Sequence, residues 1–134
     1  MKTYLSLFLF AIIISFSSCS KSLINDKLSG NWELRHIKGI QVAHVSPDFA
    51  PGNGNLIKFT GKTFEKYNDG KLSSKGTYAV QEEKKEINNE QVSYSIVYNN
   101  DMGTKEFFNL ENGKLTLYVG EIAADGYQST YQKL

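Results

Sequence analysis

The stretch that decides the fold is residues 28–37, which read LSGNWELRHI. It contains Trp32, the single tryptophan of the 134-residue chain. Successive residues of a β-strand face opposite sides of the sheet, so Trp32, Leu34 and His36, which are two residues apart, are predicted to share one face. Gly30 carries no Cβ and is expected to let the backbone approach the indole closely. These features predict a first strand whose buried face is centred on Trp32.

Beyond this stretch, short alternating segments are separated by turn residues, of which Asp69-Gly70 and Asn112-Gly113 are the clearest hairpin signals. Seven further strands are predicted at residues 56–60, 63–67, 75–80, 92–98, 105–110, 114–119 and 127–134. Eight short strands with regular spacing indicate an all-β fold, either a sandwich or a barrel. We expect an eight-stranded antiparallel up-and-down β-barrel, because closure removes the exposed edges and leaves room for side chains or one small ligand.

Alternation also predicts which side chains point into this barrel. One-residue errors of register would invert a whole strand, so the members from each strand stand or fall together. The inward candidates are Trp32, Leu34, Ile57, Phe59, Phe64, Tyr78, Val80, Tyr94, Ile96, Phe108, Leu115, Leu117, Val119 and Tyr131.

Four segments lack a strand pattern. Residues 38–55 contain two prolines and several glycines, and are predicted to form a lid over one end of the barrel or an extra strand, using Ile40, Val42, Val45 and Phe49. Residues 81–91 are almost wholly polar, which predicts a solvated hairpin end or a short exposed helical turn; residues 99–103 are predicted to be a loop. Residues 20–27 are predicted to be a linker or one turn of helix that closes the barrel through Leu23, Ile24 and Leu28.

The N-terminus has the pattern of an export signal. After Lys2, residues 4–16 form an apolar run that is too short for a membrane span of about 20 residues but suits a secretory signal. Residues 16–19 read FSSC, which resembles a bacterial lipobox, in which the cysteine thiol is acylated and the chain is cut ahead of it. The resemblance implies a lipoprotein signal peptide at residues 1–18 and a lipidated tether at 19–27. An ordinary signal peptide followed by a coincidental cysteine is the alternative.

The Gly30-x-Trp32 pattern on a first strand, followed by short strands to the C-terminus, resembles the lipocalin-like domains of bacterial lipoproteins over residues 28–134. In lipocalins an arginine from the last strand commonly lies across this tryptophan. Arg35 is the only arginine here, so the resemblance implies that Lys133 takes that role with Gly30 and Trp32. It also implies a lipid anchor in the outer membrane, facing the periplasm, with surface exposure left open.

The net charge and the cysteine content limit the kinds of binding partner and of covalent bond that the chain is expected to have. Removal of residues 1–18 would take away Lys2 alone among the charged side chains and leave equal numbers of basic and acidic groups. A chain without net charge is not typical of proteins that bind nucleic acid or hold membranes by polybasic contacts. Cys19 is the only cysteine, so no intramolecular disulfide can form. We expect a monomer that is attached to the membrane through acyl chains.

No pattern of catalytic or metal-binding residues emerges. His36 and His44 lack the spacing of a zinc site, and Gly61-Lys62-Thr63 lacks the earlier glycine of a phosphate-binding loop. No serine lies in a nucleophile elbow. The sequence therefore predicts no catalytic residue, no metal and no cofactor.

Aromatic residues are the one unusual resource, with eight tyrosines and eight phenylalanines. A buried tyrosine hydroxyl needs a hydrogen-bond partner, so several inward tyrosines suit a partly hydrated cavity. The candidate ligand-binding residues are Tyr78, Tyr94, Tyr98, Phe108 and Tyr127. Non-catalytic binding of a small, partly apolar molecule is the preferred function. A protein-interaction module, such as an inhibitor or accessory subunit without an internal ligand, is the main alternative, and a catalytic lipocalin relative is the third.

Overall fold

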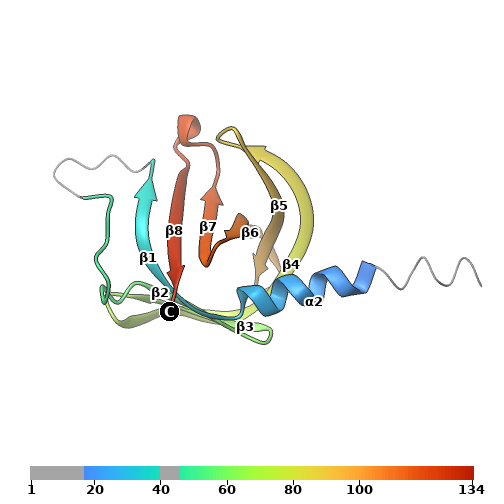
Figure 1. The fold of residues 1–134 in the computed structure, drawn as a ribbon, viewed down its shortest axis with the longest axis horizontal. Helices are drawn as coiled ribbons and strands as arrows, with labels where there is room; N and C mark the ends of the chain where they lie inside the picture. Colours follow the sequence, from blue (N-terminus) through green and yellow to red (C-terminus); the bar gives the residue numbers. More distant parts are fainter. Residues whose placement is uncertain (1–16, 40–45) are drawn as a thin grey trace, which may run out of the picture.

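Within its described residues, the chain folds as a closed β-barrel with one short α-helix (Figure 1). The computed structural model describes residues 17–39 and 46–134. Helix α2 (Ser17–Leu28) precedes β1 (Gly30–Lys38), β2 (Leu56–Thr60), β3 (Thr63–Asn68), β4 (Lys71–Ile87), β5 (Glu90–Tyr98), β6 (Asp101–Glu111), β7 (Lys114–Val119), the 3₁₀ turn η1 (Ile122–Ala124) and β8 (Tyr127–Lys133). Each strand pairs antiparallel with the next, and β8 pairs with β1 to close the ring. This confirms the predicted eight-stranded antiparallel up-and-down barrel.

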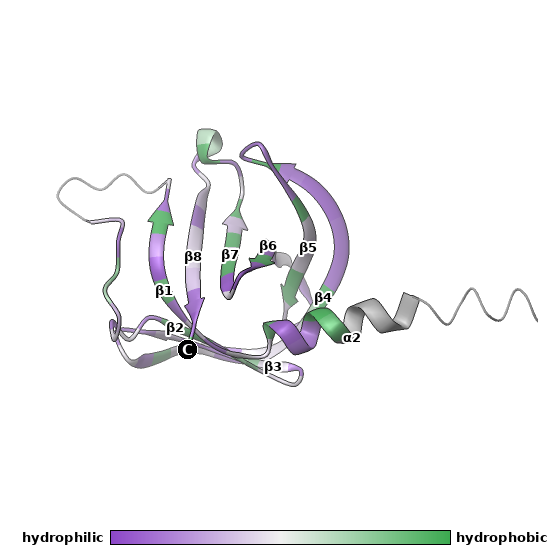
Figure 2. Cartoon of the chain, viewed as in Figure 1, coloured by the Kyte–Doolittle hydropathy of each residue, from purple (hydrophilic) through white to green (hydrophobic). Residues whose placement is uncertain are grey.

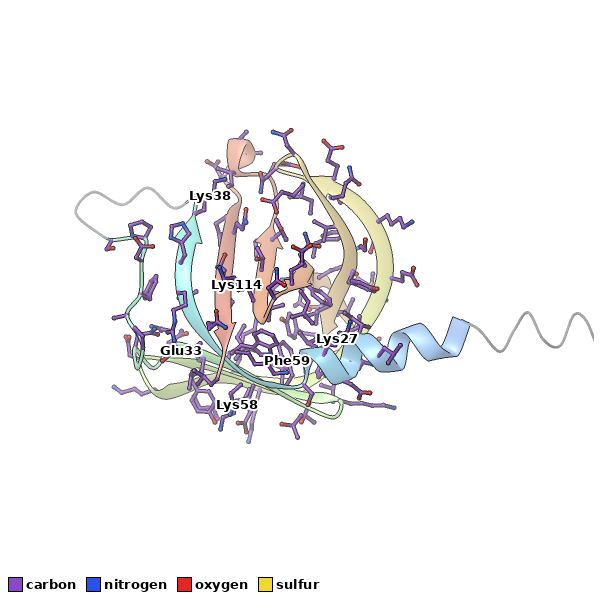
Figure 3. All side chains as sticks on the ribbon, viewed as in Figure 1. Lys27, Glu33, Lys38, Lys58, Phe59 and Lys114 are labelled. Atoms are coloured by element: carbon purple, nitrogen blue, oxygen red, sulfur yellow. The ribbon has the colours of Figure 1, made fainter. Side chains whose placement is uncertain are left out.

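The barrel interior follows the predicted alternation. Figure 3 shows Phe59 inside the barrel and Lys58, one residue earlier on β2, on the outer side. The residues predicted to point inward are buried, except Tyr94, Val119 and Tyr131, which are partly buried. Burial of these large apolar side chains, at about 25 cal/mol per Å² of apolar surface, is the main force that holds the ring closed.

β1 departs from simple alternation at Arg35. Its register with β8 shifts between Leu34 and His36, which makes Arg35 part of a β-bulge. After the bulge, Ile37 lines the same internal pocket as Leu34. The imidazole of His36 lies instead at the surface, where 42% of the side chain is exposed. The prediction that His36 shares a face with Trp32 is therefore wrong.

The segment after residue 45 returns along β1. The backbone N–H of Ile37 donates to the carbonyl of Pro47, and that of Phe49 donates to the carbonyl of Arg35, both at 2.9 Å. Residues 47–49 thus form an isolated antiparallel bridge, at His36 and Asp48, beside the C-terminal part of β1 and not a full strand. The other apolar residues of the predicted lid, Ile40, Val42 and Val45, lie outside the described residues.

The polar segment 81–91 is a hairpin. β4 and β5 continue through it and meet at Asn88 and Asn89, whose φ angles of 54° and 64° suit a tight hairpin turn. The prediction of a hairpin end is correct and that of a helical turn is wrong. Figure 2 shows β4 as hydrophilic over most of its length. In the same way, the loop predicted at residues 99–103 is a tight turn at Asn99-Asn100, and β6 begins at Asp101.

The far part of this hairpin packs on the outside of the barrel. Phe107 and Tyr118 pair across β6 and β7, on the face opposite to the internal pair of Phe108 and Leu117. Ile87 and Val92, on either side of the hairpin turn, join Phe107 and Tyr118 in a second buried cluster. This outer cluster covers a face of the sheet that water would otherwise reach.

Helix α2 closes one end of the barrel, beside the C-terminus (Figure 1). Leu28 is fully buried and Ile24 is 8% exposed, and both belong to the internal core, whereas Leu23 is 57% exposed. The predicted tether is therefore helical within the described part of the chain, and two of its three apolar residues pack onto the barrel. Among the described residues no helix is long and apolar enough to cross a membrane.

Candidate functional site

The barrel has an open end opposite to α2. The connections β1–β2, β3–β4, β5–β6 and β7–β8 gather there because consecutive strands alternate in direction. Two pockets open between these connections, with volumes of about 390 Å³ and about 310 Å³. Lys66 and Tyr127 line both pockets, so we call the two together the mouth site.

An ion pair lies at the centre of the mouth site. The ammonium Nζ of Lys66, on β3, is 3.3 Å from Oε1 of Glu106 and 3.5 Å from Oε2. The same ammonium lies 4.2 Å from the centroid of the Tyr98 ring. The Tyr98 hydroxyl donates a hydrogen bond of 2.8 Å to Glu106. One carboxylate therefore accepts from two donors, and one ring face lies against the cation.

Three tyrosines near this carboxylate remain protonated at neutral pH. Burial is the largest cause of the raised pKa of Tyr98, and the charge of Glu106 and the hydrogen bond to it add to the shift. Burial also raises the pKa values of Tyr127 and Tyr131, and the negative charge of Glu106 raises both further. These hydroxyls therefore remain able to donate hydrogen bonds over the ordinary pH range.

The five predicted ligand residues fall into two groups. Tyr98 and Tyr127 line the larger pocket. Tyr78 lies in the core instead, edge-on to Phe59 with ring centroids 4.8 Å apart, and its hydroxyl donates to the carbonyl of Gly61 at 3.0 Å. Tyr94 stacks on the fully buried Phe108 with centroids 5.6 Å apart. Neither Tyr94 nor Phe108 lines the mouth site.

Sequence reasoning missed the two charged members of the site. Lys66 lies two residues after the inward Phe64, and Glu106 lies two residues before the inward Phe108. Both positions are inward by the same alternation that predicted the core. Tyr131 was predicted to be inward but not to be a ligand residue, and it lines the smaller pocket.

The closed end contains the three residues of the predicted structural motif. The ammonium of Lys133 lies 5.2 Å from the centroid of the Trp32 ring and donates to the carbonyl of Lys27 at 3.1 Å. The indole N–H of Trp32 donates to the carbonyl of Leu28 at 2.7 Å. A Cβ on Gly30, whose φ is +130°, would lie 2.9 Å from Cε of Lys133. Gly30 thus makes room for the lysine stem, and the expectation that it admits the indole is corrected.

The remaining predicted site residue, Cys19, lies in the first turns of α2, and its side chain is outside the described part of the structure. Its acylation stays a prediction.

Among the described residues, the mouth site is lined by one acidic side chain, Glu106, and two basic ones, Lys66 and Lys105. Lys105 also lines the larger pocket, but its ammonium is paired with Glu83 at 3.0 Å. Within residues 17–39 and 46–134, no three histidine, cysteine or acidic side chains cluster as a metal site would require.

Comparison with known proteins adds no relative to this geometry: no protein-family model, no curated protein and no solved structure matches the chain.

Proposed function

We propose that the chain is a monomeric binding protein that takes a small, partly apolar molecule into the mouth site and does not alter it chemically. The observation that carries this proposal is the pair of adjoining pockets that meet at Lys66 and Tyr127 inside one end of a closed barrel. Their volumes of about 390 Å³ and about 310 Å³ suit a small ligand.

The walls of the mouth site combine the two kinds of surface that such a ligand needs. Leu34, Ile37 and Phe49 supply apolar contacts in the smaller pocket. Lys66 and the tyrosine hydroxyls supply a few polar groups that would fix the orientation of a ligand. Predominantly apolar pockets with a few placed polar groups are typical of small-molecule sites.

We further propose that Cys19 carries the lipid that holds this barrel at the outer membrane, facing the periplasm, with display at the cell surface as the other arrangement. The support is the apolar run before Cys19 and the FSSC sequence at residues 16–19. Helix α2, which contains Cys19, packs on the end of the barrel opposite to the mouth site. An anchor at this end leaves the mouth open to solvent.

The test is native mass spectrometry of the protein purified from its own host, followed by binding measurements with any retained molecule. Tyr127→Ala should weaken binding at least several-fold because it removes a wall of both pockets. Thr130→Ala on the same strand should leave it unchanged, since Thr130 alternates with the inward Ser129 and Tyr131 and therefore points outward. Absence of any retained or added ligand in the intact barrel would refute the proposal and favour the protein-interaction alternative.

A further inference from the structure

We infer that the mouth site recognises the ammonium group of a small amine, and that Lys66 occupies this place as an internal substitute which such a ligand displaces. This inference rests on the proposed ligand-binding function and names the ligand class. The ammonium of Lys66 already lies where a ligand's ammonium would lie, between the Glu106 carboxylate and the face of Tyr98.

The contacts around Lys66 are those that bind cations in proteins. A carboxylate within 3.3 Å supplies a charge-assisted hydrogen bond, and a tyrosine ring at 4.2 Å supplies a cation–π contact. Tyr127 lines the same pocket as Glu106 and Tyr98. We call Glu106 and Tyr98 the cation cage.

The cage is held more firmly than its occupant. Tyr98 is 4% exposed, and its hydroxyl fixes Glu106 through the 2.8 Å hydrogen bond. The Lys66 side chain is 27% exposed, and among the described residues its ammonium hydrogen-bonds only to Glu106. A lysine reaches its partner through a flexible four-carbon stem, and this one stands at the opening of the barrel. Lys66 can therefore leave while the cage keeps its shape.

The charge of the cage selects the class of ligand. Departure of Lys66 alone would leave the Glu106 carboxylate partly buried without a counter-ion, which is costly. An incoming ammonium restores the pair, whereas a neutral molecule does not. A carboxylate ligand would have to compete with Glu106 for Lys66 in a pocket where the other cation, Lys105, is already paired.

The rest of the ligand would lie on the apolar part of the larger pocket. Phe64, Val119 and the ring of Tyr127 line this pocket beside the cage. The ligand class is therefore a small primary or secondary amine with an aromatic or branched aliphatic body. Replacement of the Lys66 ammonium by that of the ligand gives little net binding free energy. Burial of the apolar body of the ligand supplies the binding free energy instead.

The experiment compares three probes of one shape on the full chain, purified in mild detergent. Phenethylamine is the cation, 2-phenylethanol the neutral probe and 3-phenylpropionate the anion. Dissociation constants come from NMR titrations, and circular dichroism checks the fold of each variant. The amine should bind wild type roughly tenfold more tightly than the alcohol, the factor that corresponds to about 1.4 kcal/mol.

Variants of the cage separate its parts. If Lys66 is out of the cage about one tenth of the time, only that fraction of the protein can bind an amine. Lys66→Ala, which leaves the cage always vacant, should then tighten amine binding about tenfold. Lys66→Met, which fills the cage without charge, should give no such gain. Glu106→Gln should abolish the preference for the amine. Lys58→Ala is the matched control, because the Lys58 side chain lies on the outer side of the barrel and its ammonium lies 5.3 Å from the centroid of the Tyr67 ring.

The remaining outcomes would each overturn the inference of an amine site. Equal binding of the amine and the alcohol would overturn this inference and leave the proposed function standing. Tightest binding of 3-phenylpropionate, lost in Lys66→Ala, would assign the site to anions. Failure of all three probes on folded wild type and Lys66→Ala would also overturn it, and the retained ligand would then decide the proposed function by itself. If Glu106→Gln does not fold, Tyr98→Phe, which keeps the ring and loses the hydroxyl, should weaken amine binding instead.

Discussion

Removal of the Trp32 side chain tests how the closed end of the barrel is held together. Trp32 is 1% exposed, packs in the core and donates its indole N–H to the carbonyl of Leu28. Loss of a large buried aromatic costs about 3–5 kcal/mol, and the unpaired carbonyl adds about 1 kcal/mol. Trp32→Phe keeps most of the ring and loses the hydrogen bond, so its cost should be about 1–2 kcal/mol.

Lys133 should contribute much less than Trp32. Lys133 is exposed, so the contact of its ammonium with the indole is expected to contribute about 0.5–1 kcal/mol to the free energy of unfolding. An ammonium also lacks the flat stacking surface of a guanidinium. Lys133→Met keeps part of the apolar stem that lies against Gly30 and removes the charge, and Lys114→Ala on neighbouring β7 is a control for loss of an exposed lysine.

The assay is urea denaturation of Trp32→Ala, Lys133→Ala and the double variant. The two single changes should be non-additive by about 0.5–1 kcal/mol, because their side chains are in contact. A cost below about 1.5 kcal/mol for Trp32→Ala would refute its role as the anchor of the core. A different result is that Lys133→Ala and Lys133→Met change the free energy of unfolding no more than Lys114→Ala does, and that Lys133→Ala is additive with Trp32→Ala. In that case the contact between Lys133 and Trp32 contributes nothing to stability, and this part of the lipocalin resemblance does not carry over.

Three further predictions test other parts of the structure. Burial opposes ionisation of Glu33, but hydrogen bonds from Arg35 and the Gly52 N–H outweigh it and lower the pKa of Glu33 below its ordinary 4.5. The stability that this gives is complete above roughly pH 4.5 and is lost as the pH falls through the lower folded-state pKa, so Glu33→Gln should flatten the acid limb of a stability–pH curve; an unchanged limb would contradict this. Ile87→Ala should cost about 2–4 kcal/mol and speed hydrogen exchange in the β4–β5 hairpin but not in β1; uniform exchange would show that the outer cluster is not a separate unit. Cys19→Ala should release the protein from membranes or leave it uncleaved. An unaltered membrane fraction for this variant, together with an unmodified Cys19 thiol in the wild-type protein by mass spectrometry, would refute acylation.

The barrel could be predicted because its signals are local. Alternation of period two and turns such as Asp69-Gly70 mark each strand without knowledge of its neighbours. The bulge at Arg35 has no such signal, since it arises from the pairing of β1 with β8. The outer cluster was missed for a related reason. Ile87 and Val92 are isolated apolar residues in a polar segment, and only the curvature of the hairpin brings them onto Phe107.

The ligand tyrosines show a second limit. Alternation tells which side of a strand faces the interior, but it does not tell how far along the barrel axis a residue lies, because that depends on the stagger between strands. Tyr78 and Tyr98 pair directly across β4 and β5, and both point inward. Tyr78 nevertheless packs on Phe59, whereas Tyr98 lines the larger pocket. The sequence therefore predicted a set of inward aromatic residues and could not separate core from pocket.

The two charged residues of the mouth site were passed over because charged side chains are expected outside a barrel. Their inward positions demand a cause that stability does not supply. Replacement of a buried ion pair by well-packed apolar residues is often neutral or stabilising. The Lys66 and Glu106 side chains are partly buried, at 27% and 19% exposed, so a barrel that served only as a scaffold would gain little from the pair. The paired charges stand at the opening, flanked by tyrosine hydroxyls, and not in the core around Phe108. A partly desolvated charge at a pocket is what recognition of a charged ligand requires, so the position of this pair supports the proposal that the mouth site binds an ammonium group.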